Sequence, residues 1–185
     1  DALRVSSPVS LVGLSMGGPI ASTFTVRYPE RIRKLTLIDP AGAKPIATSL
    51  LLRAAKLPQV AETVLRLVGS DFMIKSIADD FFDPALVAHF QSRYKIQMQY
   101  KGFMNAILST IRNGMLNSFS DVYQQLGVME TPVLVLWGRN DHTVPRTAHW
   151  FARQFHRWNF TRSKDAGISR ITKSPNRLTR SCWNF

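Results

Sequence analysis

The chain has 185 residues, 45% of them hydrophobic, and a formal net charge of +12. This length suits one domain with a sizeable core. No uninterrupted stretch of about 18 apolar residues occurs, so we expect no membrane span. The one cysteine and four histidines show neither a disulfide framework nor the spacing of metal ligands, so no metal site is expected.

The positive charge is concentrated at the C-terminal end of the chain. Residues 156–185 hold seven Lys or Arg against one acid, Asp165, and so carry half of the net charge. The rest of the chain is only mildly basic, so nucleic acid is not an expected partner. An inactive scaffold whose basic tail binds single strands through its cations and aromatic rings stays as a distant alternative.

The first part of the chain alternates between strand and helix. Residues 8–12 are predicted to form a short buried strand, and residues 34–38 a second one that Asp39 and Pro40 stop. Between them, residues 17–28 are predicted to form a helix that Pro29 ends. Apolar residues recur every fourth position on one face of this helix: Ile20, Phe24 and Tyr28.

Residues 43–118 differ from the segments on either side. They contain several short helical patterns without a strand pattern, and many aromatic and apolar side chains. Ordinary helical packing explains this composition, and a helical cap that closes over a pocket is compatible with it. The breaks between the helical patterns fall at proline and glycine: Pro58, Gly69, Pro84 and Gly114.

The alternation resumes after residue 118. A helix is predicted over residues 121–129, a buried strand over 132–137 and a second helix over 146–155. Continuous apolar strands that alternate with helices predict a parallel sheet and an α/β fold. Residues 1–155 are expected to form the domain and residues 156–185 a poorly ordered basic tail, in which the segment His156–Asn159 shows no strand pattern.

The motif Gly13-x-Ser15-x-Gly17 lies between the first strand and the first helix. This context is the one that a nucleophile elbow requires, because a sharp turn there holds the serine oxygen above the end of the strand. Small residues two positions before and after the serine avoid a clash in the turn. The backbone N–H of Met16, at the start of the helix, is predicted to face the oxygen that becomes negative when the serine attacks a carbonyl.

Three segments together resemble the α/β-hydrolase superfamily, in its esterase, lipase and carbon–carbon hydrolase branch. They read Leu-Val-Gly-Leu-Ser-Met-Gly-Gly, then Arg-Tyr-Pro-Glu-Arg-Ile-Arg-Lys-Leu-Thr-Leu-Ile-Asp-Pro-Ala-Gly, then Thr-Pro-Val-Leu-Val-Leu-Trp-Gly-Arg-Asn-Asp-His-Thr-Val-Pro. The resemblance covers about residues 1–155. It implies that strands five to seven of the fold are present, that strands one to four are missing, and that a helical cap is inserted after strand six.

The resemblance makes Ser15 the nucleophile and Asp141 the acid of a catalytic triad. Such an acid orients a histidine and stabilises the imidazolium that forms when the histidine takes the serine proton. Asp141 follows the strand over 132–137, so it belongs at the same sheet edge as Ser15. Asp39 is the rival acid, since some relatives place an acid after strand six, although it also reads as a residue that ends a strand.

The triad histidine is absent from its expected position. The residues Lys164 to Gly167 match those that precede it in the family, but Ile168 stands where the histidine should be, 27 residues after Asp141. We interpret this as a reading-frame error at or before residue 168. With one possible choice of codons, one extra base after Gly167 gives Gly-His-Ile-Pro-His-Asn-Glu-Lys-Pro-Glu, which resembles the usual ending of the family.

These expectations combine into a hydrolase of carboxylic esters or similar acyl substrates that works through an acyl-enzyme and needs no cofactor. A carbon–carbon bond hydrolase of ring-cleavage products is the alternative. The chain as written is expected to be inactive, because it lacks the triad histidine, half of the oxyanion hole and half of the sheet. The predicted partner is a small acyl or ester substrate. The sequence predicts neither the oligomeric state nor the location, for which the cytoplasm is only the default.

Overall fold

The computed structural model describes residues 4–45, 70–81, 83–138, 141, 150–151 and 159–163. It divides into two compact units. The first unit joins Asp1–Lys44 to Ser118–Phe185, and the second is Pro45–Asn117. The second unit covers nearly the same residues as the insertion expected at 43–118.

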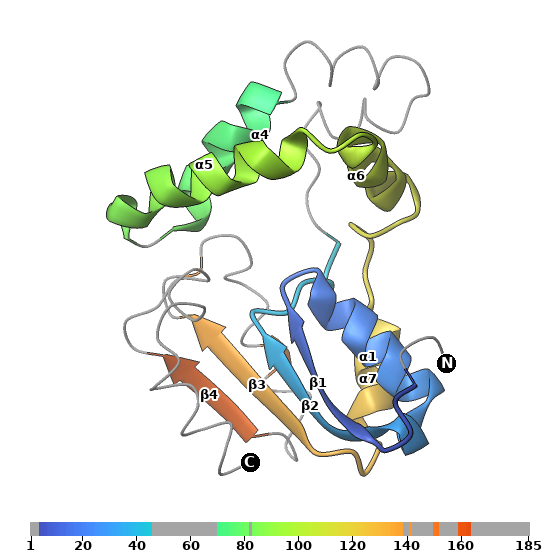
Figure 1. Ribbon diagram of the computed structural model, residues 1–185. Coiled ribbons are helices and arrows are strands. Elements are labelled where there is room, and N and C mark those ends of the chain that lie inside the picture. The colour runs from blue at the N-terminus through green and yellow to red at the C-terminus, as the bar shows by residue number, and fades with distance from the viewer. Residues whose placement is uncertain are drawn as a thin grey trace. The chain divides into compact units, whose positions relative to one another are not determined.

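The first unit is built on a parallel sheet of four strands, in the order β1-β2-β3-β4. The arrowheads of the strands in Figure 1 therefore all point to one edge of the sheet. Because the chain runs in the same direction in each strand, the segments that follow the strands meet at this edge. The strands are β1 (Val9–Leu14), β2 (Ile32–Ile38), β3 (Val133–Gly138) and β4 (Asn159–Ser163).

Two helices lie side by side against this sheet (Figure 1). Helix α1 (Gly17–Arg27) packs against β1 and β2, and α7 (Ser120–Gly127) packs against α1. A short 3₁₀ turn, η1 (Pro29–Arg31), joins α1 to β2. The proline at its first position fixes the backbone dihedral for such a turn and cannot continue the preceding helix.

The core of the first unit lies between the sheet and these helices. Every residue of β3 is buried, as expected of an apolar strand in the middle of a parallel sheet. Aromatic rings extend this core, since Tyr123 packs edge-on against Phe151 with 4.7 Å between ring centroids. The residues buried together are Ala21, Leu35, Leu37, Ala43, Tyr123, Leu126, Val133, Val135, Trp137 and Phe151.

The predicted α/β fold is confirmed, and the sheet extends further than predicted. Strand β4 pairs with β3 from Leu134↔Asn159 to Gly138↔Ser163, although the local sequence showed no strand pattern. The strand therefore owes its place to pairing along β3 and not to a hydrophobic repeat of its own. It corrects the expected boundary at residue 155, because the sheet continues into the segment assigned to the tail; residues 164–185 lie outside the described residues.

The apolar face of α1 is exposed in this unit. Ile20 is 59% exposed and Phe24 is 42% exposed, whereas the buried face consists of small and hydroxyl-bearing residues such as Ala21 and Ser22. The periodicity thus identified one helical face correctly, but it is not the face that packs on the sheet. Tyr28, the third residue of this face, stacks at a tilt on Phe24 with centroids 5.1 Å apart.

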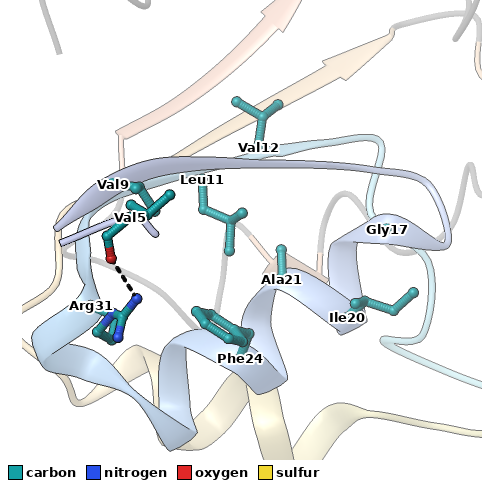
Figure 2. A pocket seen from close by; sticks show the side chains of 9 residues that line it. All are labelled: Val5, Val9, Leu11, Val12, Gly17, Ile20, Ala21, Phe24 and Arg31. Atoms are coloured by element: carbon teal, nitrogen blue, oxygen red, sulfur yellow. Dashed lines mark hydrogen bonds between the residues drawn. The ribbon is translucent and has the colours of Figure 1, made fainter. Parts of the chain in front are cut away.

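An apolar groove of about 550 Å³ runs between this helical face and β1. Figure 2 shows Leu11 directed from the strand toward the helix, while Val12 points to the opposite side of the sheet. Arg31 stands at one end of the groove, where its guanidinium donates a hydrogen bond to the Val5 carbonyl oxygen at 2.9 Å. The lining residues of this α1 groove are Val5, Val9, Leu11, Val12, Gly17, Ile20, Ala21, Phe24 and Arg31.

The described residues of the second unit form helices joined by turns, and no strand occurs among them. A chain of ring contacts runs from Phe81 through Phe90 and Tyr94 to Phe103 and holds two of the helices together. The preference for helices over strands agrees with the sequence, while a role as a cap remains a prediction. Its elements are α4 (Ser70–Ser76), η3 (Ile77–Asp80), η4 (Pro84–Leu86), α5 (Val87–Met98) and α6 (Phe103–Arg112).

The exposed α1 groove predicts self-association of the 185-residue chain. Ile20→Glu places a charge among apolar side chains, so we expect it to weaken self-association about 10-fold or more, because burying one such side chain contributes about 1.5 kcal/mol or more. Sedimentation velocity over a concentration series measures the effect. The control is Val128→Glu at the C-terminal end of α7, where the side chain is 81% exposed outside the groove. Equal effects of the two variants would contradict the prediction.

Candidate active site

Ser15 directly follows β1 and has a left-handed backbone, with φ of 48°. A non-glycine residue in this region is strained, and such strain persists only where surrounding contacts enforce it. Here the Ser15 N–H donates to the Ile38 carbonyl oxygen at 2.9 Å, which continues the β1–β2 ladder. The strand pairing thus carries the serine to the end of the sheet, where its backbone turns sharply.

Two further hydrogen bonds fix this turn from its other side. The Ser15 carbonyl oxygen accepts one from the Gly18 N–H at 2.9 Å and one from the Ala41 N–H at 3.0 Å. The first closes the turn into α1, and the second ties it to the loop after β2. The half-buried serine therefore has the strand–turn–helix setting that the nucleophile elbow requires.

The glycines of the motif do not share one role. A Cβ on Gly13 would lie 2.5 Å from the Gly17 carbonyl oxygen, so the turn requires glycine there. A Cβ on Gly17 would meet nothing within 4 Å, so the clash expected to require a small residue occurs at Gly13 and not at Gly17. The second close approach is at Gly18, where a Cβ would lie 2.6 Å from Cβ of Pro40.

Met16 is the residue that caps the N-terminus of α1, and its side chain is 44% exposed. The N-terminal end of a helix carries a partial positive charge, which favours a developing oxyanion. The position of Met16 agrees with the role assigned from the sequence. Its contribution to an oxyanion hole remains a prediction.

Asp141 lies just past β3 and is 4% exposed. Its N–H donates to the Gly138 carbonyl oxygen at 3.3 Å, which marks a tight turn at the end of the strand. Ser15 and Asp141 thus follow the C-terminal ends of β1 and β3 at the same sheet edge, with β2 between them. This arrangement suits the nucleophile and the acid of a catalytic triad, in which a histidine lies between the two.

Asp39 follows β2 and is fully buried between these two positions. It also has a left-handed backbone, with φ of 41°. One carboxyl oxygen, Oδ1, accepts a hydrogen bond from the Gly138 N–H at 2.7 Å. The pKa of Asp39 is raised to about 7: burial is the largest cause, the hydrogen bond from Gly138 opposes it, and the negative charge of Asp141 adds to it.

The loop after β2 is held by residues that the sequence analysis did not single out. The Tyr123 hydroxyl donates to the Ala41 carbonyl oxygen at 2.6 Å from within the core. Gly42 has φ of +87°, and a Cβ there would lie 2.9 Å from the Phe119 ring. The glycine that follows Asp39-Pro40-Ala41 was the available signal for such a turn, whereas nothing in the sequence connects Tyr123 to it.

The triad histidine is not located by the structure. Ile168 and three of the histidines, His142, His149 and His156, lie outside the described residues, and the fourth, His89, belongs to α5 in the second unit. Among the residues that the structure does describe, no cluster of three or more potential metal ligands occurs. No helix in the same part of the chain is long and apolar enough to cross a bilayer.

A comparison of two alanine variants tests the glycine assignment. Gly13→Ala forces a Cβ against the Gly17 backbone, so we expect a loss of about 1–3 kcal/mol in the free energy of unfolding. Gly17→Ala meets open space and replaces the least favoured non-proline helix residue, so we expect a neutral effect or a gain of up to about 1 kcal/mol. Urea denaturation measures both, and a loss of equal size in the two variants would contradict the geometry.

A pH titration of stability tests the state of Asp39. Its pKa is about 7 in the folded chain and 3.8 for an ordinary aspartate, so the folded state holds this proton more tightly. The stabilisation is complete below about pH 4 and is lost as the pH rises through about 7. Asp39→Asn removes this loss, which amounts to about 1.4 kcal/mol for each pH unit between the two values.

Chemical denaturation of the variant and the parent chain between pH 4 and pH 8 measures the effect. The matched control is Asp121→Asn, which makes the same charge change at an exposed position in the first turn of α7. We expect the pH slope to change more in Asp39→Asn than in this control. Equal slopes in Asp39→Asn and the parent chain would show that the pKa of Asp39 is the same in the folded and unfolded states.

Comparison with known proteins agrees with this geometry. Among curated proteins, the chain is 34% identical over 152 residues to a 2-hydroxy-6-oxo-6-phenylhexa-2,4-dienoate hydrolase of Burkholderia cepacia, which covers 78% of this chain and 50% of that protein. It is 28% identical over 163 residues to a 2-hydroxymuconate semialdehyde hydrolase of a Pseudomonas species, with 84% and 55% covered. The chain thus spans about half the length of the curated relatives it matches.

Solved structures show the same fold. A thermophilic esterase from Thermogutta terrifontis superposes with a TM-score of 0.74 at 24% identity, over 99% of this chain and 66% of that one. A meta-cleavage product hydrolase from Pseudomonas fluorescens IP01 gives 0.73 at 18% identity, over 100% and 67%. A family model described as the alpha/beta hydrolase fold matches residues 1–167. This chain is therefore a member of the α/β-hydrolase family.

Proposed function

We propose that the chain carries the nucleophile and the acid of a serine hydrolase that cleaves a carbon–carbon bond in a ring-cleavage product. Ser15 acts as the nucleophile, Asp141 as the triad acid and the Met16 N–H as an oxyanion donor. The observation that supports this most strongly is the left-handed Ser15 at the end of β1, held by bonds on both sides of its peptide. The curated relatives supply the substrate class.

The chemistry of this substrate class fits an activated serine. The 6-oxo group of a 2-hydroxy-6-oxo-dienoate is a carbonyl that Ser15 Oγ can attack. Once the 2-hydroxy end has tautomerised to its keto form, the bond between C5 and C6 breaks. Its electron pair stays on C5, where it is conjugated with that keto group and takes up a proton. The acyl group stays on the serine, and water then releases it.

Carboxylic ester hydrolysis is the second candidate and was the first choice from the sequence. Both reactions begin with attack of a serine on a carbonyl, so the elbow at Ser15 serves either one. The curated relatives favour the alternative instead, because those with the quoted identities are named as hydrolases of ring-cleavage products. The substrate assignment is therefore changed, while the nucleophile and the acid are kept.

A chimera tests the proposed function directly. The part of the Burkholderia cepacia hydrolase that aligns with this chain is replaced by the aligned residues of this chain, so that the relative supplies the remainder. We expect the chimera to turn over 2-hydroxy-6-oxo-6-phenylhexa-2,4-dienoate, and the loss of the substrate's absorbance measures this turnover. Ser15→Ala in the same chimera is the matched control, and we expect it to lower kcat by about 10⁴-fold or more.

The outcomes of this experiment separate the candidates. Turnover of a p-nitrophenyl ester without turnover of the dienoate would favour the ester hydrolase. A chimera that unfolds cooperatively in thermal denaturation and turns over neither substrate would contradict the proposal. Activity that survives Ser15→Ala would remove the serine from the mechanism.

The chain as written is predicted to be inactive, because Ile168 stands where the triad histidine is expected. We expect no turnover of a p-nitrophenyl ester by the 185-residue chain, and turnover that disappears in Ser15→Ala would contradict this. Resequencing of the encoding DNA across codons 150–185 tests the cause. A single-base gap that restores histidine at position 168 is the expected result, and a confirmed isoleucine codon in an unbroken frame would contradict the frame error.

A further inference from the structure

Asp39 follows β2 directly and continues the ladder of hydrogen bonds that joins β2 to β3. In the β2–β3 ladder, the Leu35 N–H donates to the Pro132 carbonyl oxygen and the Asp39 N–H donates to the Leu136 carbonyl oxygen, each at 2.9 Å. The two donors are four residues apart and so are the two acceptors. The parallel register therefore continues without a shift to the end of β2. The next bond of this series would join the Gly138 N–H to the backbone carbonyl of Asp39.

The side chain of Asp39 takes the place of that carbonyl. Its φ of 41° turns the backbone out of the strand conformation, and the carboxyl oxygen Oδ1 accepts from the Gly138 N–H at 2.7 Å instead. The Gly138 carbonyl oxygen in turn accepts from the Asp141 N–H at 3.3 Å. Gly138 therefore links the two aspartates: its N–H binds the Asp39 carboxyl group, and its carbonyl oxygen binds the N–H of Asp141.

The same short segment also holds the serine turn. The Ile38 carbonyl oxygen accepts from the Ser15 N–H at 2.9 Å, and the Ala41 N–H donates to the Ser15 carbonyl oxygen at 3.0 Å. Asp39 lies between these two bonds in the chain. Its backbone faces the nucleophile on β1, and its side chain faces the acid-bearing turn after β3.

The charge state of Asp39 follows from the same surroundings. The side chain is fully buried, and its second oxygen, Oδ2, has no hydrogen-bond partner among the described residues. Asp141 is the charged group in the described part of the chain that acts on it, and both this charge and burial raise the pKa of Asp39. A neutral Asp39 carboxyl at this place avoids a second buried negative charge beside Asp141.

We propose that Asp39 is a positioning residue, whose carboxyl group joins the end of β2 to the turn of Asp141 and so sets the acid relative to Ser15. This inference rests on the proposed function, because it concerns the same reaction. It gives Asp39 a role other than that of the triad acid, and the bond from the Gly138 N–H to Oδ1 supports this role. An uncharged hydrogen-bond acceptor of the same shape then serves as well as the acid.

Amide NMR of the full 185-residue chain tests the proposal without any need for turnover. Backbone ¹H–¹⁵N spectra are recorded for Asp39→Asn and Asp39→Ala, with Asp121→Asn as the control for charge. We expect Asp39→Asn to leave the amide shifts of Ser15 and Asp141 close to those of the parent chain, because the amide oxygen still accepts from Gly138. We expect Asp39→Ala to displace the amide signals of Ser15, Gly138 and Asp141 together.

A second measurement keeps the proposal testable if Asp39→Ala fails to fold. In the parent chain, the Gly138 amide should titrate with a midpoint of about 7, which is the pKa of its acceptor. In Asp141→Asn the midpoint should fall by a fraction of a pH unit, because one negative charge is removed. This titration and its shift in Asp141→Asn would show that the Asp39 carboxyl group binds the Gly138 amide and senses the charge at position 141.

Two results would overturn the inference. Displacement of the Ser15 and Asp141 signals in Asp39→Asn as strong as in Asp39→Ala would show that the acid itself is required. A Gly138 amide that does not titrate between pH 4 and pH 8, or that titrates identically in Asp141→Asn, would show that the two carboxyl groups are independent. The NMR signals are measured on the 185-residue chain and do not depend on turnover by the chimera. Failure of the proposed function is therefore distinguishable from failure of this inference.

Discussion

The parallel register of β1, β2 and β3 is the constraint on which the site depends. The strands pair in register from Ser10 to Leu14 of β1 and from Leu35 to Ile38 of β2, so the positions that follow the three strands, Ser15, Asp39 and Asp141, are brought to one edge. Backbone bonds across this edge enforce left-handed conformations at Ser15 and Asp39 that neither residue would adopt alone. The pairing of β1, β2 and β3 and the burial of β3 offset the free energy of this strain.

Packing behind the edge makes the turns rigid. Gly13 and Gly18 allow α1 to begin directly against the end of β1 and against Pro40, with no room for a Cβ at either glycine. From α7, Tyr123 holds the Ala41 carbonyl oxygen, and the same loop binds the Ser15 carbonyl oxygen through its Ala41 N–H. The helices thus stabilise the fold and the serine turn through the same contacts.

The sequence predicted the fold and the elbow because both depend on local patterns. Continuous apolar strands, a Gly-x-Ser-x-Gly turn and the strand before Asp141 are visible in short windows. Strand β4 was missed because its pairing with β3, and not its own composition, places it in the sheet. The role of Asp39 was missed for a similar reason, since its bond to Gly138 spans 99 residues. The exposed apolar face of α1 shows a further limit of local patterns, because periodicity identifies an apolar face but not what covers it.

The central claim is that this edge makes Ser15 a nucleophile, and the most direct measurement is covalent trapping. The chimera is treated with a fluorophosphonate, which reacts with activated serines, and its peptides are mapped by mass spectrometry. The account predicts one phosphonylated residue, Ser15, and slower labelling in Asp141→Asn. A chimera that hydrolyses the dienoate while Ser15 stays unlabelled would contradict the account.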